Sequence, residues 1–269
     1  MNASEDDIAA AEAYEELHVP AFFQQWAPVV LDAATLKEGD RVLDVACGTG
    51  ILAREAKARF GGSCVVTGLD AGAGMLAVAQ RLDPSIDWRQ GLAESLPFDD
   101  AVFDVVVSQF GLMFFQDRPA AIRQMLRVLA PRGRLAVAVW DSLNNSEAYL
   151  LEVDLLERRA GGDAADALRA PFALGDKAQL EDIFSLADVQ SIDISTLDGK
   201  ARFPSIRSMV EADLRGWLPV MGVSLSDDLV ESILEEAEGV LAGYVTEMGT
   251  VEFRTPAHVV TVKKRPDAA

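Results

Sequence analysis

Two glycines and a carboxylate stand where an apolar run of the chain meets a helical pattern. Residues 42–45 form that run and include Asp44, and the small-residue loop behind it holds Gly48 and Gly50. Glycine allows close backbone approach and positive φ, and the first turn of the following helix offers unpaired N–H groups. A carboxylate at the carboxyl end of a parallel strand repels a pyrophosphate and attracts a cation. The segment therefore predicts a site for a nucleoside cofactor that carries a positive charge.

A second carboxylate, Asp70, ends the next apolar run. At the end of a second parallel strand, a carboxylate can accept hydrogen bonds from both hydroxyls of a ribose. We therefore expect Asp70 to bind the ribose of the cofactor.

These and later motifs resemble the class I S-adenosylmethionine-dependent methyltransferases, particularly the ubiquinone and menaquinone biosynthesis branch. The segments that carry the resemblance are residues 42–50, 68–70, 74–76, 91–98, 103–106 and 126–133. As an ordered set they are far more specific than any one glycine motif. The resemblance implies S-adenosyl-L-methionine as the cofactor, with S-adenosyl-L-homocysteine as the product.

The resemblance also implies which residues bind the cofactor. They are Asp44, Ala46, Gly48, Thr49, Gly50, Asp70, Ala71, Met75, Ala93, Glu94, Ser108 and Gln109. Met75 would lie under the adenine, although a Met at helical spacing is also a common core residue. Leu92 stands where the family usually has an acid that contacts the adenine amine, so that contact would fall to the backbone of Ala93 and to Glu94. Ala46 replaces a glycine of many members.

Methyl transfer from a sulfonium can be accelerated by positioning and by exclusion of water, so a catalytic base is optional. The candidate catalytic residues are His18 and the neighbouring Tyr14. Of the two histidines, His18 is the better candidate for a base, and a structural role for His18 is the open alternative. His258 lies in a predicted strand and should be structural. The acceptor is expected to be a small, uncharged or partly apolar molecule, attacked through O, N, C or S. Its pocket would be lined by Phe22, Trp26, Met113, Phe114 and Trp140.

Composition limits the possible partners. The 43 acids and 24 bases among 269 residues give a net charge of −19, which argues against nucleic acid and against anionic membranes. No apolar run approaches the roughly 20 residues of a membrane span. The two cysteines have neither metal-ligand nor disulfide spacing, and Asp141 with Asn144 and Asn145 is more simply a turn than a metal site. We expect no metal, a cytoplasmic location, and a monomer or homodimer.

The pattern of short apolar runs and helical segments predicts a Rossmann-like α/β fold. Expected strands are residues 41–45, 64–69, 86–89, 102–107 and 134–140, with helices over 51–60, 73–82 and 118–129. Two further helices, 5–17 and 20–36, precede them. Later elements are helices 147–159, 178–186, 205–218 and 226–241, a strand 189–197, a mobile loop 160–167 and a strand 251–263, which the resemblance implies is antiparallel.

These elements predict one domain over residues 1–269 with a seven-stranded, mostly parallel sheet. Residues 1–36 form a helical lid, residues 37–142 the cofactor-binding core, and residues 143–269 a C-terminal half with a helical insertion at about 204–243.

Two other functions fit parts of the pattern. The loop at Gly48 and Gly50, followed by Ala53, also satisfies a dinucleotide fingerprint, which would make the chain an NAD(P)-dependent oxidoreductase. Against this, Asp44 would face the pyrophosphate, and no tyrosine has a lysine four residues later. A catalytically silent nucleoside-binding protein shares all the cofactor features and stays open.

Overall fold

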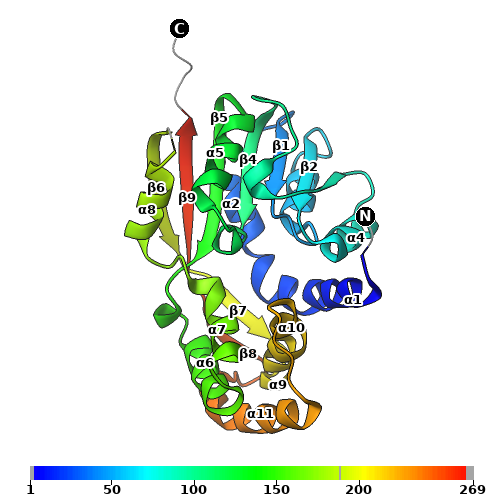
Figure 1. The fold of residues 1–269 in the computed structure, drawn as a ribbon, viewed down its shortest axis with the longest axis vertical. Helices are drawn as coiled ribbons and strands as arrows, with labels where there is room; N and C mark the ends of the chain where they lie inside the picture. The colour runs from blue at the N-terminus through cyan, green and yellow to red at the C-terminus, as the bar shows by residue number, and fades with distance from the viewer. Residues whose placement is uncertain (1–2, 188, 265–269) are drawn as a thin grey trace.

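The computed structural model describes residues 3–187 and 189–264 and contains the predicted sheet. The seven strands are β1 (Arg41–Val45), β2 (Val65–Asp70), β3 (Asp87–Gln90), β4 (Phe103–Gln109), β5 (Leu129–Trp140), β6 (Val189–Leu197) and β9 (Ala257–Lys264). They are ordered β3-β2-β1-β4-β5-β9-β6, with β9 antiparallel to both of its neighbours (Figure 1). The central strands are apolar on both faces, as a sheet covered by helices on each side requires.

Helices connect these strands and cover the sheet. They include α2 (Trp26–Ala33), α3 (Ile51–Arg59), α4 (Ala73–Leu82), α5 (Arg118–Val128) and α8 (Lys177–Ser185). α5 begins where the sequence predicts, because the Asp117 side chain accepts a hydrogen bond from the Ala120 amide and Pro119 occupies the first turn. The five strands and three helices expected between residues 41 and 140 are confirmed, although β5 begins earlier than expected.

The N-terminal segment is continuous where two separate helices were expected. α1 (Glu5–Ala13) passes directly into the π-helical segment η1 (Tyr14–Phe23), and Pro20 lies inside η1 rather than at a helix start. Proline has no amide hydrogen, so it interrupts α-helical bonding, and the wider π turn accommodates it. The Gln24 amide accordingly donates to the Val19 carbonyl, five residues back, at 2.8 Å.

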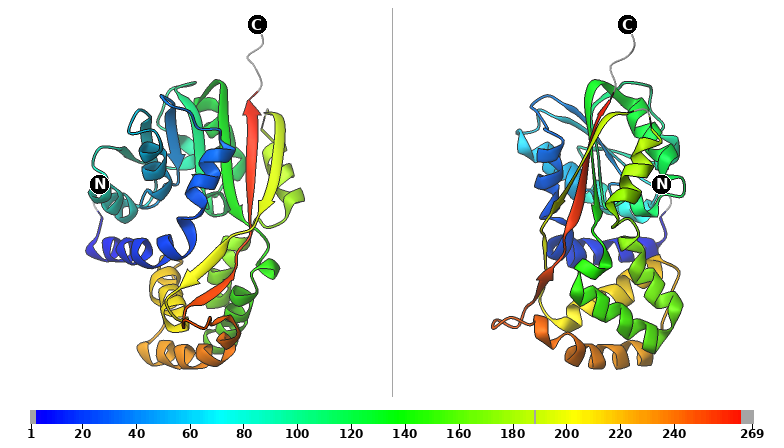
Figure 2. Two further views of the ribbon diagram at one scale, coloured as in Figure 1. Left: turned by 180° about the vertical axis from the view of Figure 1, so that it is seen from behind. Right: turned by 90° about the vertical axis from the view of Figure 1, so that its left-hand side faces the viewer.

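The expected strand 251–263 is instead two strands. β8 (Val251–Arg254) pairs with β7 (Lys200–Phe203) in a separate ribbon, and only β9 enters the main sheet. Pro256 interrupts the ladder because it has no N–H to donate, while the Thr255 amide donates to the Gly199 carbonyl at 2.9 Å. The β7–β8 ribbon leads from the main sheet to a group of helices (Figure 2).

Those helices form a cap beyond the carboxyl ends of the parallel strands (Figure 1). The cap consists of α6 (Glu147–Ala160), α7 (Gly162–Arg169), α9 (Ile206–Glu211), the π-helical segment η6 (Ala212–Trp217), α10 (Leu218–Val220) and α11 (Asp227–Val240). The expected loop at residues 160–167 was wrong. Its alanines and Leu168 form the buried face of α7, which packs on α6, and Gly161 with φ +89° separates the two helices.

No helix in residues 3–187 and 189–264 is both long and apolar enough to cross a membrane.

Candidate active site

The loop after β1 has the backbone that its glycines predict. Gly48 and Gly50 have φ of +55° and +91°, and Ala46 also lies in the left-handed region at +58°. Gly50 caps α3, and a Cβ there would overlap the Trp88 ring. A Cβ on Gly48 would meet nothing closer than Tyr14, at 4.0 Å across an open cavity. Gly48 therefore gives a ligand access, whereas Gly50 allows the loop to pack on Trp88.

Asp70 is held rigidly at the end of β2. Its Oδ2 accepts a hydrogen bond from the Gly48 amide and its Oδ1 one from the Gly72 amide, both at 2.8 Å. Burial raises the pKa of Asp70, and the amides of Gly72 and Gly48 act in the opposite direction. Each carboxylate oxygen keeps a second lone pair, so the side chain can still accept two further hydrogen bonds.

Asp44 is buried on β1, with 1% of its surface exposed. Neither of its carboxylate oxygens has a hydrogen-bond partner among the residues that the structure describes. Burial raises the pKa of Asp44 well above its ordinary value, and the Ala53 amide and the charge of Arg54 oppose this shift only in part. An unpaired buried carboxylate is costly, so this position favours a ligand that brings a positive charge and N–H donors.

A cavity of about 690 Å³ lies over these strand ends. The predicted cofactor residues that line it are Asp44, Ala46, Gly48, Asp70, Ala71, Met75, Ala93, Glu94 and Gln109. Thr49, Gly50 and Ser108 are not in its wall; Thr49 and Ser108 are buried behind it. The lining also includes Tyr14 from the N-terminal segment, Trp217, Val220 and Met221 from the cap, and the predicted acceptor residue Phe114. The cap residues carried no recognisable motif, so sequence reasoning did not include them.

Two predicted cofactor residues also hold the walls of the cavity together. Glu94 Oε1 accepts hydrogen bonds from the amides of Gln116 and Asp117, at 2.9 and 3.4 Å, and so fixes the loop before α5. Gln109 Nε2 donates to the Phe23 carbonyl at 3.2 Å and ties β4 to η1. Both side chains are thus held in place before any ligand binds.

A smaller recess of about 90 Å³ adjoins the cavity and is mainly aromatic. It shares Tyr14, Phe110, Phe114 and Trp217 with the cavity, and its other lining residues are His18, Phe22, Phe23, Trp140, Tyr149, Leu168, Pro171, Phe172 and Asp213. Of the predicted acceptor pocket, Phe22, Phe114 and Trp140 line the recess. Trp26 packs edge-on against Trp140, and Met113 is buried outside both linings. Sequence reasoning missed the residues contributed by α6, α7 and η6.

The two histidines have different surroundings. His258 is locked into the sheet: its Nδ1 contacts the Thr196 hydroxyl and its Nε2 the Gly175 carbonyl, both at 3.0 Å. His18 stacks on Tyr14, and its Nε2 lies 3.3 Å from Oδ1 of Asp213 in the cap. The prediction of a structural His258 agrees with this geometry. Both histidines have an acidic partner, because Asp141 Oδ1 lies 3.1 Å from His258 Nε2 and Asp213 lies beside His18, and the sequence revealed neither contact.

No metal-binding group of three or more His, Cys, Asp or Glu residues occurs in the described part of the chain. Asp141 accepts hydrogen bonds from the Ser142 amide and the Asn145 side chain, at 2.7 and 2.8 Å, which is the predicted turn. Cys47 and Cys64 are both free and buried.

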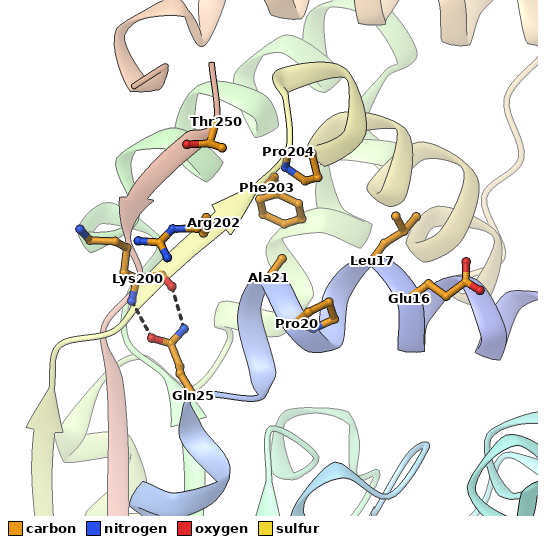
Figure 3. Close-up of a pocket in the computed structure, with 10 residues that line it drawn as sticks. All are labelled: Glu16, Leu17, Pro20, Ala21, Gln25, Lys200, Arg202, Phe203, Pro204 and Thr250. Carbon is orange, nitrogen blue, oxygen red and sulfur yellow. Dashed lines mark hydrogen bonds between the residues drawn. The ribbon is translucent and has the colours of Figure 1, made fainter. Parts of the chain in front are cut away.

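A third hollow, of about 640 Å³, lies on the other side of η1 and is open to the surface (Figure 3). Gln25 joins η1 to β7 there, through hydrogen bonds with both the carbonyl and the amide of Lys200, at 2.8 and 3.0 Å (Figure 3). Its wall contains none of the predicted cofactor residues.

Comparison with known proteins agrees with this geometry. Residues 43–137 match the family model described as a methyltransferase domain. The 2-phytyl-1,4-naphtoquinone methyltransferase of Thermosynechococcus vestitus is 41% identical over 115 residues, which cover 42% of this chain and 51% of that protein. A ubiquinone/menaquinone biosynthesis C-methyltransferase of Xanthomonas oryzae is 42% identical over 118 residues, covering 42% and 47%. The chain thus spans about half the length of these curated relatives.

Among solved structures, the fold is similar to that of a Haemonchus contortus phosphoethanolamine N-methyltransferase 2 in complex with phosphomonomethylethanolamine and S-adenosylhomocysteine. The TM-score is 0.60 at 18% identity, over 96% of this chain and 58% of that one. At this identity the likeness concerns the fold alone.

The sheet order is that of the class I methyltransferase fold, and residues 43–137 within it match the methyltransferase domain. Over the matched residues the chain is similar to the curated quinone methyltransferases described above.

Proposed function

We propose that this protein transfers a methyl group from S-adenosyl-L-methionine to a neutral small molecule and releases S-adenosyl-L-homocysteine. The observation that carries the proposal is the buried, unpaired carboxylate of Asp44 beside the glycine loop. A dinucleotide would bring its pyrophosphate to that loop and meet repulsion, whereas the ammonium group of a methionine moiety would supply the missing charge. The alternative of an NAD(P)-dependent oxidoreductase is disfavoured for this reason.

The remaining residues of the cavity fit the rest of the cofactor. Asp70 has free lone pairs for a ribose, Gly48 leaves space for close approach, and Met75 and Ala93 offer an apolar wall to an adenine. The Gln109 amide oxygen has no hydrogen-bond partner among the described residues, so this side chain of the cavity wall can contribute a polar contact near the end of β4.

The sulfonium of the bound cofactor supplies the methyl group together with a good leaving group. The chain then has to place the acceptor in line with that group and to exclude water. Tyr14 and Trp217, which stand between the cavity and the aromatic recess, are suited to both tasks because they touch the two spaces at once. We infer that the acceptor binds across this junction with its apolar part in the recess. The quinone acceptors in the names of the curated relatives support an aromatic acceptor.

We further propose that the three segments 1–36, 37–142 and 143–269 act as one domain, with the first as a lid. The net charge of −19 supports the absence of a nucleic-acid partner, and free thiols agree with a cytoplasmic location. We propose a monomer or homodimer as the working form.

Calorimetric titration with S-adenosylhomocysteine, NAD and NADP tests the proposal. We expect saturable binding of S-adenosylhomocysteine alone and weaker binding in Asp44→Asn, because the neutral amide attracts an ammonium group less strongly. Asp99→Asn, which changes an exposed acid in the same half of the chain, is the matched control and should bind like the wild type. Preference for a dinucleotide would overturn the proposal. Tight nucleoside binding without turnover on any acceptor would favour a catalytically silent protein.

A further inference from the structure

The aromatic recess contains polar groups that the cofactor does not need. His18 from η1 and Asp213 from η6 face each other in its wall, and both are buried. Tyr149 of α6 also lines it, and Glu152, one turn further along α6, is completely buried near Asp213. Four of their polar atoms, His18 Nδ1, Asp213 Oδ2 and both Glu152 oxygens, have no hydrogen-bond partner among the described residues.

We propose that His18 is the catalytic base, that Asp213 positions it, and that the acceptor is a neutral aromatic molecule whose hydroxyl group is methylated. This inference rests on the proposed methyl transfer and adds the base, its partner and the class of acceptor.

The geometry determines which nitrogen of His18 is free. Nε2 lies 3.3 Å from Asp213 Oδ1, and a carboxylate can only accept, so the neutral imidazole carries its hydrogen on Nε2. Nδ1 is then left with a lone pair and has no partner. A buried acid that fixes the tautomer of a histidine and leaves the opposite nitrogen with a free lone pair is the arrangement by which hydrolases prepare a general base.

The charge of the cluster favours a proton on His18 after the reaction. A neutral acceptor that gains a methyl cation must lose a proton to return to neutrality. The imidazolium formed beside Asp213 is stabilised by that carboxylate. Burial, followed by the charge of Asp213, raises the pKa of Glu152 well above its ordinary value. The titratable groups around the His18–Asp213 pair are Tyr14 on η1 and both Tyr149 and Glu152 on α6.

The step balances with one proton transfer. The O–H bond of the acceptor breaks and its proton moves to His18 Nδ1. The oxygen electron pair forms a bond to the methyl carbon while the carbon–sulfur bond breaks, and that pair stays on sulfur, which becomes the neutral thioether of S-adenosylhomocysteine. A later proton loss from His18 to solvent restores the base.

The recess lining restricts the acceptor. Phe22, Phe110 and Trp140 offer ring faces and edges, with Phe110 stacked on Trp140 at a centroid distance of 3.7 Å. No Lys or Arg lines the recess among the described residues, so a phosphate or carboxylate on the acceptor would lack a counter-charge beside two acids. His18 is also the only basic side chain in this lining, which suits a reaction that releases a single proton.

Nuclear magnetic resonance tests the tautomer without any acceptor. The chain has two histidines, so ¹⁵N-labelled protein gives two imidazole spin systems, which His18→Gln assigns. In the complex with S-adenosylhomocysteine, we expect neutral His18 to carry its hydrogen on Nε2. Asp213→Asn should weaken this preference, whereas Asp154→Asn, an exposed acid on α6, should not change it. A hydrogen on Nδ1 in the wild type would overturn the role of His18. Because this complex requires cofactor binding, the result separates failure of the base from failure of the proposed function.

Turnover tests the acceptor class. We would measure S-adenosylhomocysteine formation with 1-naphthol, 1,4-naphthohydroquinone and hydroquinone, and with 1-methoxynaphthalene and benzylamine as comparison compounds. We expect methylation of hydroxylated probes only, and a loss of kcat in His18→Gln of about 100-fold or more with cofactor affinity unchanged. Asp213→Asn should lose about 10-fold or more in kcat. Methylation of benzylamine alone, no turnover of any hydroxylated probe, or wild-type kcat in His18→Gln would each overturn the inference.

Discussion

The two glycines of the cofactor loop should have different roles, with Gly50 required for stability and Gly48 for ligand binding. In Gly50→Ala, the new methyl group meets the Trp88 ring and the backbone is held at φ +91°. A left-handed residue with a Cβ costs about 1–2 kcal/mol. An overpacked core methyl costs about 1–3 kcal/mol more. The expected loss in the free energy of unfolding is therefore about 2–5 kcal/mol, read from urea denaturation.

The matched control for Gly50→Ala is Gly61→Ala. Gly61 has φ +61°, and a Cβ there meets nothing within 4 Å, so only the left-handed cost of about 1–2 kcal/mol applies. Gly48→Ala should resemble this control in stability, because its Cβ meets only Tyr14 at 4.0 Å. It should nevertheless bind S-adenosylhomocysteine at least 10-fold more weakly, about 1.4 kcal/mol, since the methyl group enters the cavity.

Equal stability of Gly50→Ala and Gly61→Ala would refute the packing of the loop on Trp88. Unchanged nucleoside affinity in Gly48→Ala would refute the close approach of a ligand at Gly48. The two measurements are independent, so one half of the reasoning can fail while the other stands.

Other variants test the carboxylates. Asp70→Ala should weaken S-adenosylhomocysteine binding in calorimetry by about 1.5–3 kcal/mol, through loss of charge-assisted hydrogen bonds, and unchanged affinity would remove its ribose role. The pKa values of buried Asp44 and Glu152 are raised, so at these two groups the folded state binds more protons than the unfolded state. Their contribution to the free energy of unfolding should therefore increase as the pH falls from 7 toward the ordinary carboxyl range. Glu152→Gln should accordingly stabilise the protein at pH 7 by at least about 1 kcal/mol. In thermal denaturation the variant should also show a weaker dependence of stability on pH. A destabilised variant with unchanged pH dependence would contradict a cost of burying the Glu152 carboxyl group.

The sequence predicts a helix or strand well where the spacing of its apolar residues and the residues at its ends indicate the same element. β1 and β4 each have an apolar centre, Val42–Leu43 and Val105–Val107, and α5 has an acid and a proline at its start, so local chemistry indicates all three elements. The alanine-rich segment of α7 looked like a loop because its glycines and aspartates dominate the local pattern. It is helical because its alanines pack on α6, which is a tertiary effect.

The acceptor side was less predictable for a related reason. Asp213 meets His18 across 195 positions of sequence, and no motif marks the pairing. Trp217 and Tyr149 likewise come from helices that were recognised only as helices. Cofactor residues, in contrast, are arranged by short loops at strand ends, where residue type and spacing carry the information. Even there, the packing role of Gly50 against Trp88 is visible only in three dimensions.

The place of β9 in the main sheet has a consequence for the order of folding. β6 contacts the sheet only through β9, which is inserted between β6 and β5. During synthesis, β1 to β5 emerge early and can pair with one another, but β6 has no neighbouring strand until residues 257–264 leave the ribosome. Until then β5 remains an open edge and most of the cap has already been made. We therefore expect that the early half of the sheet forms first and that closure by β9 is a late, long-range step, which slows folding and exposes an aggregation-prone edge.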